Sequence, residues 1–438
     1  MKNRSVLVSL VFLFAVSFAD AKYSGRTGEP NNPYRISTPE DLNDIGNHQD
    51  DWNKHFILIN DINLAEYTGT QFKIIGNSTT TFIGVFDGND HKVWSFTWSS
   101  TSRSYISLFG YVGSGGQIKN LRMENVKVNA VNGGHVGGMV GTNLGTITNC
   151  YSTGSITGNL DVGGLVGSNY EFGSIINCYS TGSVTGNWEV GGLVGENYGN
   201  LSGEGVIANC YSTGSVSGKS EGSGLAGQKP YGTITNCYSK GSALGTAYVG
   251  GLVGDNDGII TDSYCTGSVT GNEFVGGLVG YHCGVGITAC YSTGSVSGEN
   301  FVGGMVGFCC APETILVSFW DTQTSGLETS DGGRGKTTFE MKRKNTFAYA
   351  GWDFVNIWDI CERTHYPRLR WQILAADFLC PYGVDFADFA ILASTWQTDP
   401  NEPNWRPACD ISEPKDDFID GFDLAIFCEN WLAPPKAE

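Results

Sequence analysis

The stretch that decides the fold reads VGGMVGTNLGTITNCYSTGSITG and occupies residues 136–158. Close copies of it begin at Val162, Val190, Ser223, Val249 and Val275. A seventh copy, from Phe301, keeps only the first half of the pattern, and two weaker copies precede the block, from Gly84 and Ser107. Self-similarity at a nearly constant period is the signature of a repeat architecture.

Each copy holds three short β-type runs, exemplified by GGLVG, TITNCYS and GSVTG, with glycine and asparagine between them. One copy cannot bury its own apolar face, so the copies must stack. Like strands then lie in register, and nine coils spaced ~4.8 Å apart make a rod about 43 Å long. Recurrent glycines suit corners that need a positive φ or a close backbone approach.

The repeats therefore predict an all-β fold, a parallel β-solenoid of about nine coils, with a small α-helical module at the C-terminus. A propeller or sandwich is the competing fold. A propeller blade needs four strands and about 40 residues. Equivalent positions from Cys150 to Cys290 are 26–32 residues apart, which favours the solenoid.

The repeated text resembles the GLUG repeat of bacterial secreted and surface proteins, in VGGLVG followed by I-x-N-C-Y-S-T-G-S-V-[ST]-G. The resemblance covers residues 105–326, and six copies match over more than 20 positions. It implies an adhesive or structural role, an adhesin-like protein, without naming a ligand.

The N-terminus indicates export. Lys2 and Arg4 precede an apolar run from Val6 to Phe18, and Ala19-Asp20-Ala21 is a small-x-small cleavage pattern. These features predict a signal peptide over 1–21. The alternative is a membrane anchor, but a span takes about 20 apolar residues. We expect a secreted or cell-surface protein with no membrane span.

The segments that flank the repeats predict caps, because exposed strand edges invite aggregation. Residues 22–104 form an N-terminal cap and first coil, with a helix beginning at Ser37-Thr38-Pro39. Residues 327–376 form the C-terminal cap, with a capping box at Thr337 and Glu340 for a helix near 339–349. Five aromatic residues are expected to cover the last coil, or to bind carbohydrate as a strip: Trp352, Phe354, Trp358, Tyr366 and Trp371.

Residues 377–438 are a separate acidic module. The net charge of the chain is −18, and this segment carries 13 acidic and 3 basic side chains. Such a charge repels nucleic acid and attracts cations. Residues 384–397 align without gaps to residues 419–432, so that each of two acidic pairs is followed by an apolar helical stripe.

The spacing of the acids predicts structural Ca²⁺, which takes 6–8 hard oxygen ligands. The second loop offers Asp410, Ser412, Asp416, Asp420, Asp423 and the carbonyl of Phe418. The first loop is degenerate: it offers Asp377, Asp385 and Asp388, but Leu379 and Pro381 occupy two ligand positions. The alternative is that the acids only favour the helix dipole.

The acidic module is similar to a type I dockerin, a pair of loop–helix calcium repeats. This resemblance covers 377–433 and implies a cohesin-like partner in a larger extracellular assembly. It places partner contacts at Phe386, Ala387, Gly421 and Phe422. These residues differ from the small hydroxyl pair of cellulosomal dockerins, which leaves the partner open.

The sequence offers few catalytic motifs. It has no HExxH helix, no P-loop and no G-x-S-x-G elbow. Asp255, Asp257 and Asp262 are the densest acidic set in the repeats, and turn chemistry explains them equally well. The sequence thus favours a non-catalytic binding or scaffold protein with glycan or cell wall as a further ligand. The alternative is a β-helix polysaccharide lyase or glycoside hydrolase attached to an extracellular assembly.

The 13 cysteines fall into two groups. Five occupy one repeat position and predict a column of buried thiols, because parallel neighbours in a column are poorly aimed for a disulfide: Cys150, Cys178, Cys210, Cys237 and Cys290. In the acidic module, Cys409 and Cys428 form one candidate pair.

Overall fold

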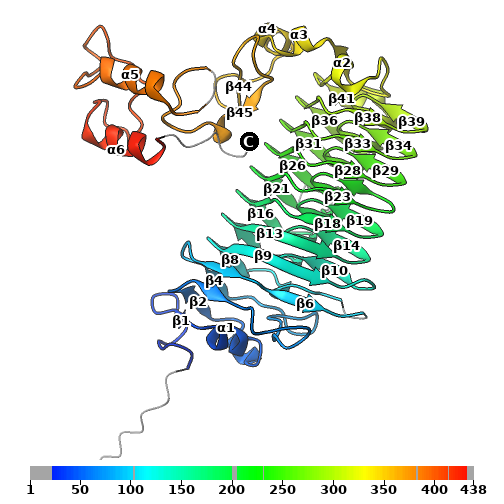
Figure 1. Ribbon diagram of the computed structural model, residues 1–438, viewed down its shortest axis with the longest axis vertical. Coiled ribbons are helices and arrows are strands. Elements are labelled where there is room, and N and C mark those ends of the chain that lie inside the picture. The colour runs from blue at the N-terminus through cyan, green and yellow to red at the C-terminus, as the bar shows by residue number, and fades with distance from the viewer. Residues whose placement is uncertain are drawn as a thin grey trace, which may run out of the picture.

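The computed structural model describes residues 22–101, 104–199, 205–229, 231–380, 383–412 and 414–431. The signal peptide over 1–21 lies outside the described residues. Figure 1 shows a rod of stacked strands, with α1 at one end and α2, α3 and α4 at the other. The predicted all-β fold, a parallel β-solenoid of about nine coils with few helices, is confirmed.

One side of the rod is an 11-stranded parallel sheet that runs from the N-terminal segment to the last coil. Its strands are β1 (Tyr34–Ile36), β2 (His55–Leu58), β4 (Val85–Asp87), β8 (Gln117–Lys119), β12 (Thr146–Thr148), β16 (Ser174–Ile176), β21 (Val206–Ala208), β26 (Thr233–Thr235), β31 (Ile259–Thr261), β36 (Gly286–Thr288) and β41 (Ile315–Leu316). Each central residue of a strand, such as Ile147 opposite Ile175, points into the core.

Two further sheets meet at a second side of the rod. The 7-stranded sheet holds β10 (Gly134–Gly137), β14 (Leu160–Gly163), β19 (Trp188–Gly191), β24 (Gly222–Ser223), β29 (Ala247–Gly250), β34 (Glu273–Gly276) and β39 (Asn300–Gly303). The 8-stranded sheet holds β7 (Phe109–Val112), β11 (Val140–Asn143), β15 (Val166–Tyr170), β20 (Val194–Tyr198), β25 (Ala226–Lys229), β30 (Val253–Asn256), β35 (Val279–His282) and β40 (Val306–Cys309).

The remaining strands of the rod pair along a third side. They are β3 (Ile62–Asn63), β5 (Lys92–Trp94), β6 (Thr97–Ser99), β9 (Arg122–Asn129), β13 (Tyr151–Thr157), β17 (Tyr179–Ser180), β18 (Ser183–Thr185), β22 (Tyr211–Ser212), β23 (Val216–Ser217), β27 (Tyr238–Ser239), β28 (Ala243–Leu244), β32 (Tyr264–Cys265), β33 (Val269–Thr270), β37 (Tyr291–Ser292), β38 (Val296–Ser297), β42 (Phe319–Asp321) and β43 (Arg334–Lys336). All of these pairings are parallel, and their register aligns like residues of successive copies.

Helices lie outside the repeats. They are α1 (Pro39–Ile45), η1 (Gln49–Asp51), η2 (Pro312–Thr314), α2 (Thr322–Ser325), α3 (Thr338–Met341), α4 (Lys344–Ala348), η3 (Arg370–Gln372), α5 (Phe386–Ser394) and α6 (Gly421–Glu429). The two predicted helix starts are correct: Thr38 caps α1, and Thr337 forms a capping box with Glu340 at α3. The single helix expected near 339–349 is instead two short helices, because Lys342 and Arg343 leave helical geometry between α3 and α4.

Columns of identical side chains fill the inside of the rod. The predicted thiol column is present, and its cysteines are buried and free. The Sγ of Cys178 accepts a hydrogen bond from the backbone N–H of Cys150 at 3.4 Å, and Ser263 continues the column by accepting from Cys237 at 3.1 Å. Burial raises the pKa of the Cys150, Cys178 and Cys210 thiols well above the usual range.

The glycines are needed mainly for close approach. A Cβ on Gly163 would collide with the carbonyl oxygen of Val166, and one on Gly214 would collide with that of Gly182 in the coil before it. Positive φ falls elsewhere, at asparagines such as Asn149 and Asn177, whose side chains form a hydrogen-bonded column with a 3.1 Å contact. The expected close backbone approach of the glycines is thus present, whereas asparagine occupies many of the positive-φ corners, because it tolerates this conformation and also pairs with its neighbours.

The C-terminal cap lies along the side of the rod as well as beyond its end. Stacked tyrosines line that side, with ring centroids 4.6–5.1 Å apart: Tyr151, Tyr179, Tyr211, Tyr238, Tyr264 and Tyr291. Trp371 packs on Tyr211 and Tyr238, and its indole N–H donates to the carbonyl of Asn236 at 3.1 Å. Trp352 packs on Phe319 of the last coil, as expected. Trp371 instead reaches earlier coils, because the tyrosine column offers a further apolar surface.

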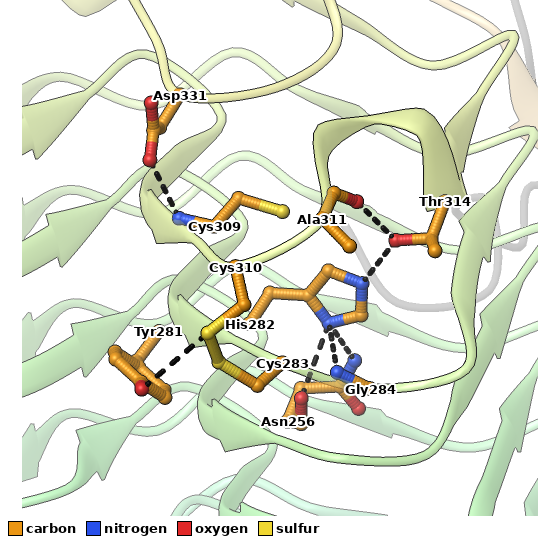
Figure 2. Close-up of a disulfide and its surroundings, with 10 residues drawn as sticks. All are labelled: Asn256, Tyr281, His282, Cys283, Gly284, Cys309, Cys310, Ala311, Thr314 and Asp331. Atoms are coloured by element: carbon orange, nitrogen blue, oxygen red, sulfur yellow. Dashed lines mark hydrogen bonds between the residues drawn. A yellow bond between two sulfur atoms is a disulfide. The ribbon is translucent and has the colours of Figure 1, made fainter.

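Two disulfides hold the C-terminal part of the chain. Cys283–Cys310 joins adjacent coils just after β35 and β40, and Figure 2 shows it beside His282, whose ring hydrogen-bonds Asn256 and Thr314. The Cα atoms of this pair are 4.9 Å apart, so neighbouring rungs can be bridged where a turn re-aims the side chains. Cys361–Cys380 links the cap, which ends with the antiparallel pair β44 (Trp358–Asp359) and β45 (Arg368–Leu369), to the acidic module. The candidate pair Cys409 and Cys428 is wrong, since both are free.

Candidate functional site

One residue of each coil forms a column outside the apolar core, which we call the left-handed column; its exposure ranges from 2% at Asp161 to 51% at Phe301. It is the residue that precedes the VGG triplet or its equivalent, and strand register aligns it from coil to coil. In order along the rod it reads Tyr105, His135, Asp161, Glu189, Glu221, Tyr248, Phe274 and Phe301. All eight have φ between 50° and 62°, a conformation that is uncommon for residues other than glycine.

A second column runs beside it on the 8-stranded sheet. Its register joins Tyr111, Thr142, Ser168, Glu196, Gln228, Asp255, Tyr281 and Phe308. The two columns contact each other because β14 packs beside β15 and β29 beside β30. Together they form one face, which we call the binding face, with a carboxylate centre between two aromatic ends.

Several carboxyl groups with very different pKa values lie at the centre of the binding face. Nδ1 of His135 lies 2.7 Å from Oδ2 of Asp161 and 2.7 Å from the Ser168 hydroxyl. Burial raises the pKa of Asp161, but hydrogen bonds from His135 and Glu189 outweigh it and hold that pKa below its ordinary value. Asp161 is thus the ionised partner in this cluster.

The carboxyl groups that neighbour Asp161 have raised pKa values. Burial and the adjacent Asp161 carboxylate raise the pKa of Glu189 to about 10. Burial raises the pKa of Glu196 to about 7, with Asp161 adding to the shift, and burial likewise raises the pKa of Glu221. Further along, burial and Asp257 raise the pKa of Asp255 to about 7. At neutral pH the face therefore offers protonated carboxyls and carboxylates side by side.

Aromatic rings form the two ends of the face. Tyr105 stacks on His135 with centroids 4.8 Å apart at one end. At the other, Phe274 stacks between Tyr248 and Phe301 with centroids 4.9 Å apart, and Tyr281 stacks on Phe308 at 5.3 Å. Edge-to-face contacts of 5.5 to 5.9 Å tie Phe274 to Tyr281 and Phe308, so the patch is packed in a fixed arrangement.

Sequence reasoning missed this cluster. It singled out Asp255, Asp257 and Asp262 because they are close in sequence, but the structure separates them: Asp255 lies on the binding face, and Asp262 accepts a hydrogen bond from the Trp358 indole at 3.2 Å under the cap. Asp161, Glu189 and Glu221 are 28 and 32 residues apart. Alignment of the copies at the residue before VGG would have revealed them.

The two acidic loops of the C-terminal module have matching geometry. Backbone N–H groups of Ile411 and Ser412 donate to Oδ1 of Asp423 at 2.7 and 2.9 Å. In the first loop, Phe378 and Leu379 donate to Asp388 in the same way, at 2.7 and 3.0 Å. The predicted ligands Asp385 and Asp420 are the N-caps of α5 and α6.

The first ligand position of each loop holds a buried oxygen without a partner. Oδ1 of Asp377 and Oδ1 of Asp410 are buried and accept no hydrogen bond, and Asp410 is only 2% exposed. The other oxygen of each accepts a backbone N–H, from Gly383 at 2.8 Å and from Asp417 at 3.1 Å. Unpaired buried carboxylate oxygens are costly, and a cation would satisfy them.

The remaining predicted ligands of the two loops are not all directed toward one common position. Ser412 is buried, Asp416 is exposed and accepts from the backbone N–H of Phe418 at 3.1 Å, and Pro381 lies outside the described residues. Among the residues that the structure describes, no group of three or more His, Cys, Asp or Glu side chains is arranged to hold a metal ion.

The helices of the module present apolar side chains to solvent. The expected partner residues Phe386 and Phe422 are 75% and 70% exposed, and Ala387 and Gly421 are exposed beside them. Phe386, Phe389, Phe427 and Trp431 line a groove of about 330 Å³ between α5 and α6. Its lining makes this surface suited to an apolar partner.

The fold and the two columns define a class of protein, a repeat-built parallel β-solenoid with a variable outward face. Three consecutive segments, residues 132–157, 158–185 and 186–217, match the family described as the GLUG motif. The chain thus contains GLUG repeats in the centre of its rod.

Two curated relatives match about a third of the chain. Halomucin of Haloquadratum walsbyi is 33% identical over 157 residues, which is 34% of this chain and 2% of halomucin. A protein of Evansella cellulosilytica, named as a Gly-rich membrane protein, is 32% identical over 150 residues, which is 33% of this chain and 17% of that protein. The similarity thus spans a small part of each relative's length.

A solved structure from Bacteroides ovatus, whose name assigns it to the immunoglobulin A1 proteases, aligns with 80% of this chain and 95% of its own. Its TM-score is 0.47 at 22% identity. A TM-score below 0.5 does not establish a common fold. Within the described residues, no helix combines the length and the apolar character needed to cross a membrane.

Proposed function

We propose that this protein is an extracellular, non-catalytic scaffold whose rod binds a neutral linear glycan along the binding face, and whose C-terminal module tethers it to a larger assembly. The observation that carries the proposal is the binding face itself: carboxyl groups at its centre and packed aromatic rings at both ends. Sugar rings present flat C–H surfaces that pack on aromatic side chains, and their hydroxyls hydrogen-bond carboxyl groups. Coil spacing of ~4.8 Å lets one extended chain contact several rungs.

The face suits a neutral ligand better than a charged one. Asp161 is ionised, and Glu189 beside it holds a proton that a sugar oxygen can accept. Left-handed backbone at every position of the left-handed column fixes where each of its side chains emerges, so this part of the binding geometry exists before the ligand arrives. Such preorganisation lowers the entropy lost on binding.

The test is affinity electrophoresis on neutral polysaccharides such as xylan, mannan and β-glucan. We expect retardation by at least one of them, and a Phe274→Ala variant should bind about tenfold more weakly, since aromatic contacts are worth ~1 kcal/mol or more. Phe339→Ala is the matched control, because Phe339 is exposed on α3, away from the face. Equal binding by both variants, or retardation by none of the glycans, contradicts the proposal.

The tether is a separate part of the proposal. Asp410, Ser412, Asp416, Asp420, Asp423 and the Phe418 carbonyl would hold Ca²⁺ in the second loop, and Asp377, Asp385 and Asp388 would contribute to a weaker first site. The buried, unpartnered oxygens of Asp377 and Asp410 support this assignment. Bound Ca²⁺ would fix the loops and so present Phe386, Ala387, Gly421 and Phe422 to a cohesin-like module.

Calorimetric titration with CaCl₂ tests the tether. Asp410→Asn keeps the shape of the side chain and removes its charge, and we expect it to abolish the tighter binding event. Asp417→Asn is the control, since Asp417 is an exposed acid of the same loop outside the predicted ligand set. If Ca²⁺ binds both variants alike, or does not bind the unmodified protein, the calcium assignment is wrong.

A second candidate function, cleavage of the bound glycan, is favoured by one observation. Glu189 is protonated at neutral pH beside the ionised Asp161, and glycoside hydrolysis uses one acid and one carboxylate. However, the two carboxyls are in contact, whereas the known mechanisms place them about 5 Å or more apart. Release of reducing sugar that Glu189→Gln abolishes would establish cleavage and overturn the non-catalytic proposal.

A further inference from the structure

A cavity of about 330 Å³ lies where the C-terminal cap meets the tyrosine column. Its walls come from three successive coils of the rod, from the cap residue after α3, and from the cap segment that leads into β45. Ten residues line it: Lys240, Tyr264, Thr266, Tyr291, Lys342, Thr364, His365, Tyr366, Pro367 and Arg368. None of these ten described residues is acidic, although the chain carries 44 acidic and 26 basic residues.

Lys240 is a departure from the repeat. The motif after the thiol column reads YSTG in four copies and YCTG in a fifth, but YSKG at residues 238–241. The lysine thus replaces a threonine in the coil that borders the cavity. Its Nζ lies over the ring of Tyr238, 5.6 Å from the centroid, which holds the ammonium at the cavity wall.

The cap brings the other cations to the same place. Nζ of Lys342 lies over the ring of Tyr366, 5.2 Å from its centroid. Arg368, the first residue of β45, lines the same cavity. The hydroxyls of the surrounding tyrosines are engaged elsewhere, with Tyr291 donating to the Pro367 carbonyl at 2.5 Å and Tyr366 to Asp321 at 2.8 Å.

From this geometry we infer that the cavity is a binding site for a monosaccharide-sized ligand that carries a carboxylate or sulfate group. Cations from three separate segments converge on it, which suits one anionic group. Threonine and histidine side chains line the rest of the wall and suit hydroxyl groups, and about 330 Å³ is enough for a small ring but not for a long chain. The site does not depend on the binding face, since it lies on another side of the rod.

The site also joins two parts of the protein. Lys240 and Thr266 belong to the rod, whereas Lys342 and Arg368 belong to the cap. A ligand that contacts both stabilises the docked cap, because whatever binds only the native arrangement raises its stability. Binding is therefore visible as a shift in cap unfolding as well as in direct titration.

The experiment titrates the full-length mature protein with galacturonate, glucose 6-sulfate, inorganic sulfate and glucose by NMR or calorimetry. We expect the two acidic sugars to bind, glucose not to bind, and inorganic sulfate to bind more weakly than glucose 6-sulfate. The comparison of galacturonate with glucose 6-sulfate decides which anionic group is preferred. Binding should weaken as NaCl is added, because the attraction is screened.

The decisive variant is Lys240→Thr, which restores the motif of the other coils and so leaves the fold intact. We expect about a tenfold loss of affinity for the acidic sugars. Lys219→Thr is the matched control, as Lys219 is exposed in a corner away from the cavity. Lys342→Met should cause a similar loss from the cap side. Unchanged affinity in Lys240→Thr, equal binding of glucose, or inorganic sulfate binding as tightly as both acidic sugars would each refute a site for an acidic sugar.

Discussion

At the residue scale, the left-handed column sets the chemistry of the rod without affecting its core. The side chain there points outward while the following valine is buried, so the fold accepts His, Asp, Glu, Tyr or Phe at the same place. Where three such residues are acidic, burial disfavours the charged forms of Glu189 and Glu221, and the Asp161 carboxylate adds to this effect. The cluster is thus held at a cost to stability, as is common at functional sites.

The cost predicts a specific pH dependence. Glu196 has a pKa of about 7 in the folded chain against an ordinary value of 4.5, so the folded state binds the additional proton and stability falls as pH rises from about 4.5 to 7. Glu196→Gln should therefore stabilise the protein by on the order of 3 kcal/mol at pH 9 and little at pH 4. Urea unfolding at the two pH values measures this, with Glu328→Gln as an exposed control. An equal effect at both pH values would exclude the predicted linkage.

Cysteine reactivity is a second consequence at this scale. The thiolate is the reactive form. The column cysteines are buried, and burial raises the pKa of Cys150, Cys178 and Cys210, whereas Cys428 is exposed on α6. We expect one fast-reacting thiol with Ellman's reagent in the native protein, lost in Cys428→Ser. Slow labelling of the others should require unfolding. Rapid reaction of several thiols in native buffer would show that the column opens.

At the element scale, the cap and the rod are joined through aromatic side chains. Trp371 sits on two tyrosines, and the Gln372 amide donates to the Tyr264 hydroxyl at 2.8 Å, so the segment around η3 fixes the cap along the column. The repeat predicted the coils because every copy contains the same apolar spacing. The repeat pattern could not predict that the cap folds back along the rod, since the tyrosines on which the cap packs have the pattern of ordinary strand residues.

Removal of that contact should release the cap. Trp371→Ala is expected to destabilise cap docking by about 3 kcal/mol, the lower end of the cost of truncating a tryptophan, because Trp371 is partly buried. Hydrogen exchange of the amides around residues 238–239 and 264–265 should accelerate while that of the N-terminal coils stays slow. Tyr349→Ala serves as control, because Tyr349 is 87% exposed. Exchange that is unchanged in Trp371→Ala would mean that other contacts hold the cap.

At the scale of the whole molecule, the rod is nearly one-dimensional, and each coil contacts its two neighbours. The copy-to-copy spacing in the sequence was enough to predict its strands, register and thiol column. The candidate site was harder to predict from the sequence, since its residues differ between copies and lie about 27 positions apart. Only the matching loops of the acidic module could be identified from local spacing, at Asp410 and Asp423.

A nearest-neighbour rod should tolerate the loss of one coil. Deletion of residues 162–189 joins Asp161 to Val190 at equivalent positions of the repeat. We expect a folded, monodisperse protein that is shorter by about 4.8 Å and melts only a few degrees lower. Small-angle scattering and thermal melting measure these changes. A deletion of half a repeat, residues 162–175, is the control, because it joins Asp161 to Ile176 out of register. If both deletion variants fold equally well, register between coils is not what holds the rod.

The column before each VGG triplet also bears on how such a chain changes over generations. Since residues of the two columns of the binding face differ from coil to coil whereas the core positions are repeated, a point substitution in these columns alters recognition while folding is preserved. Duplication of a coil extends the face by one rung and supplies a fresh position for selection to act on. New ligand specificities can therefore arise one coil at a time on a repeat whose core pattern stays the same.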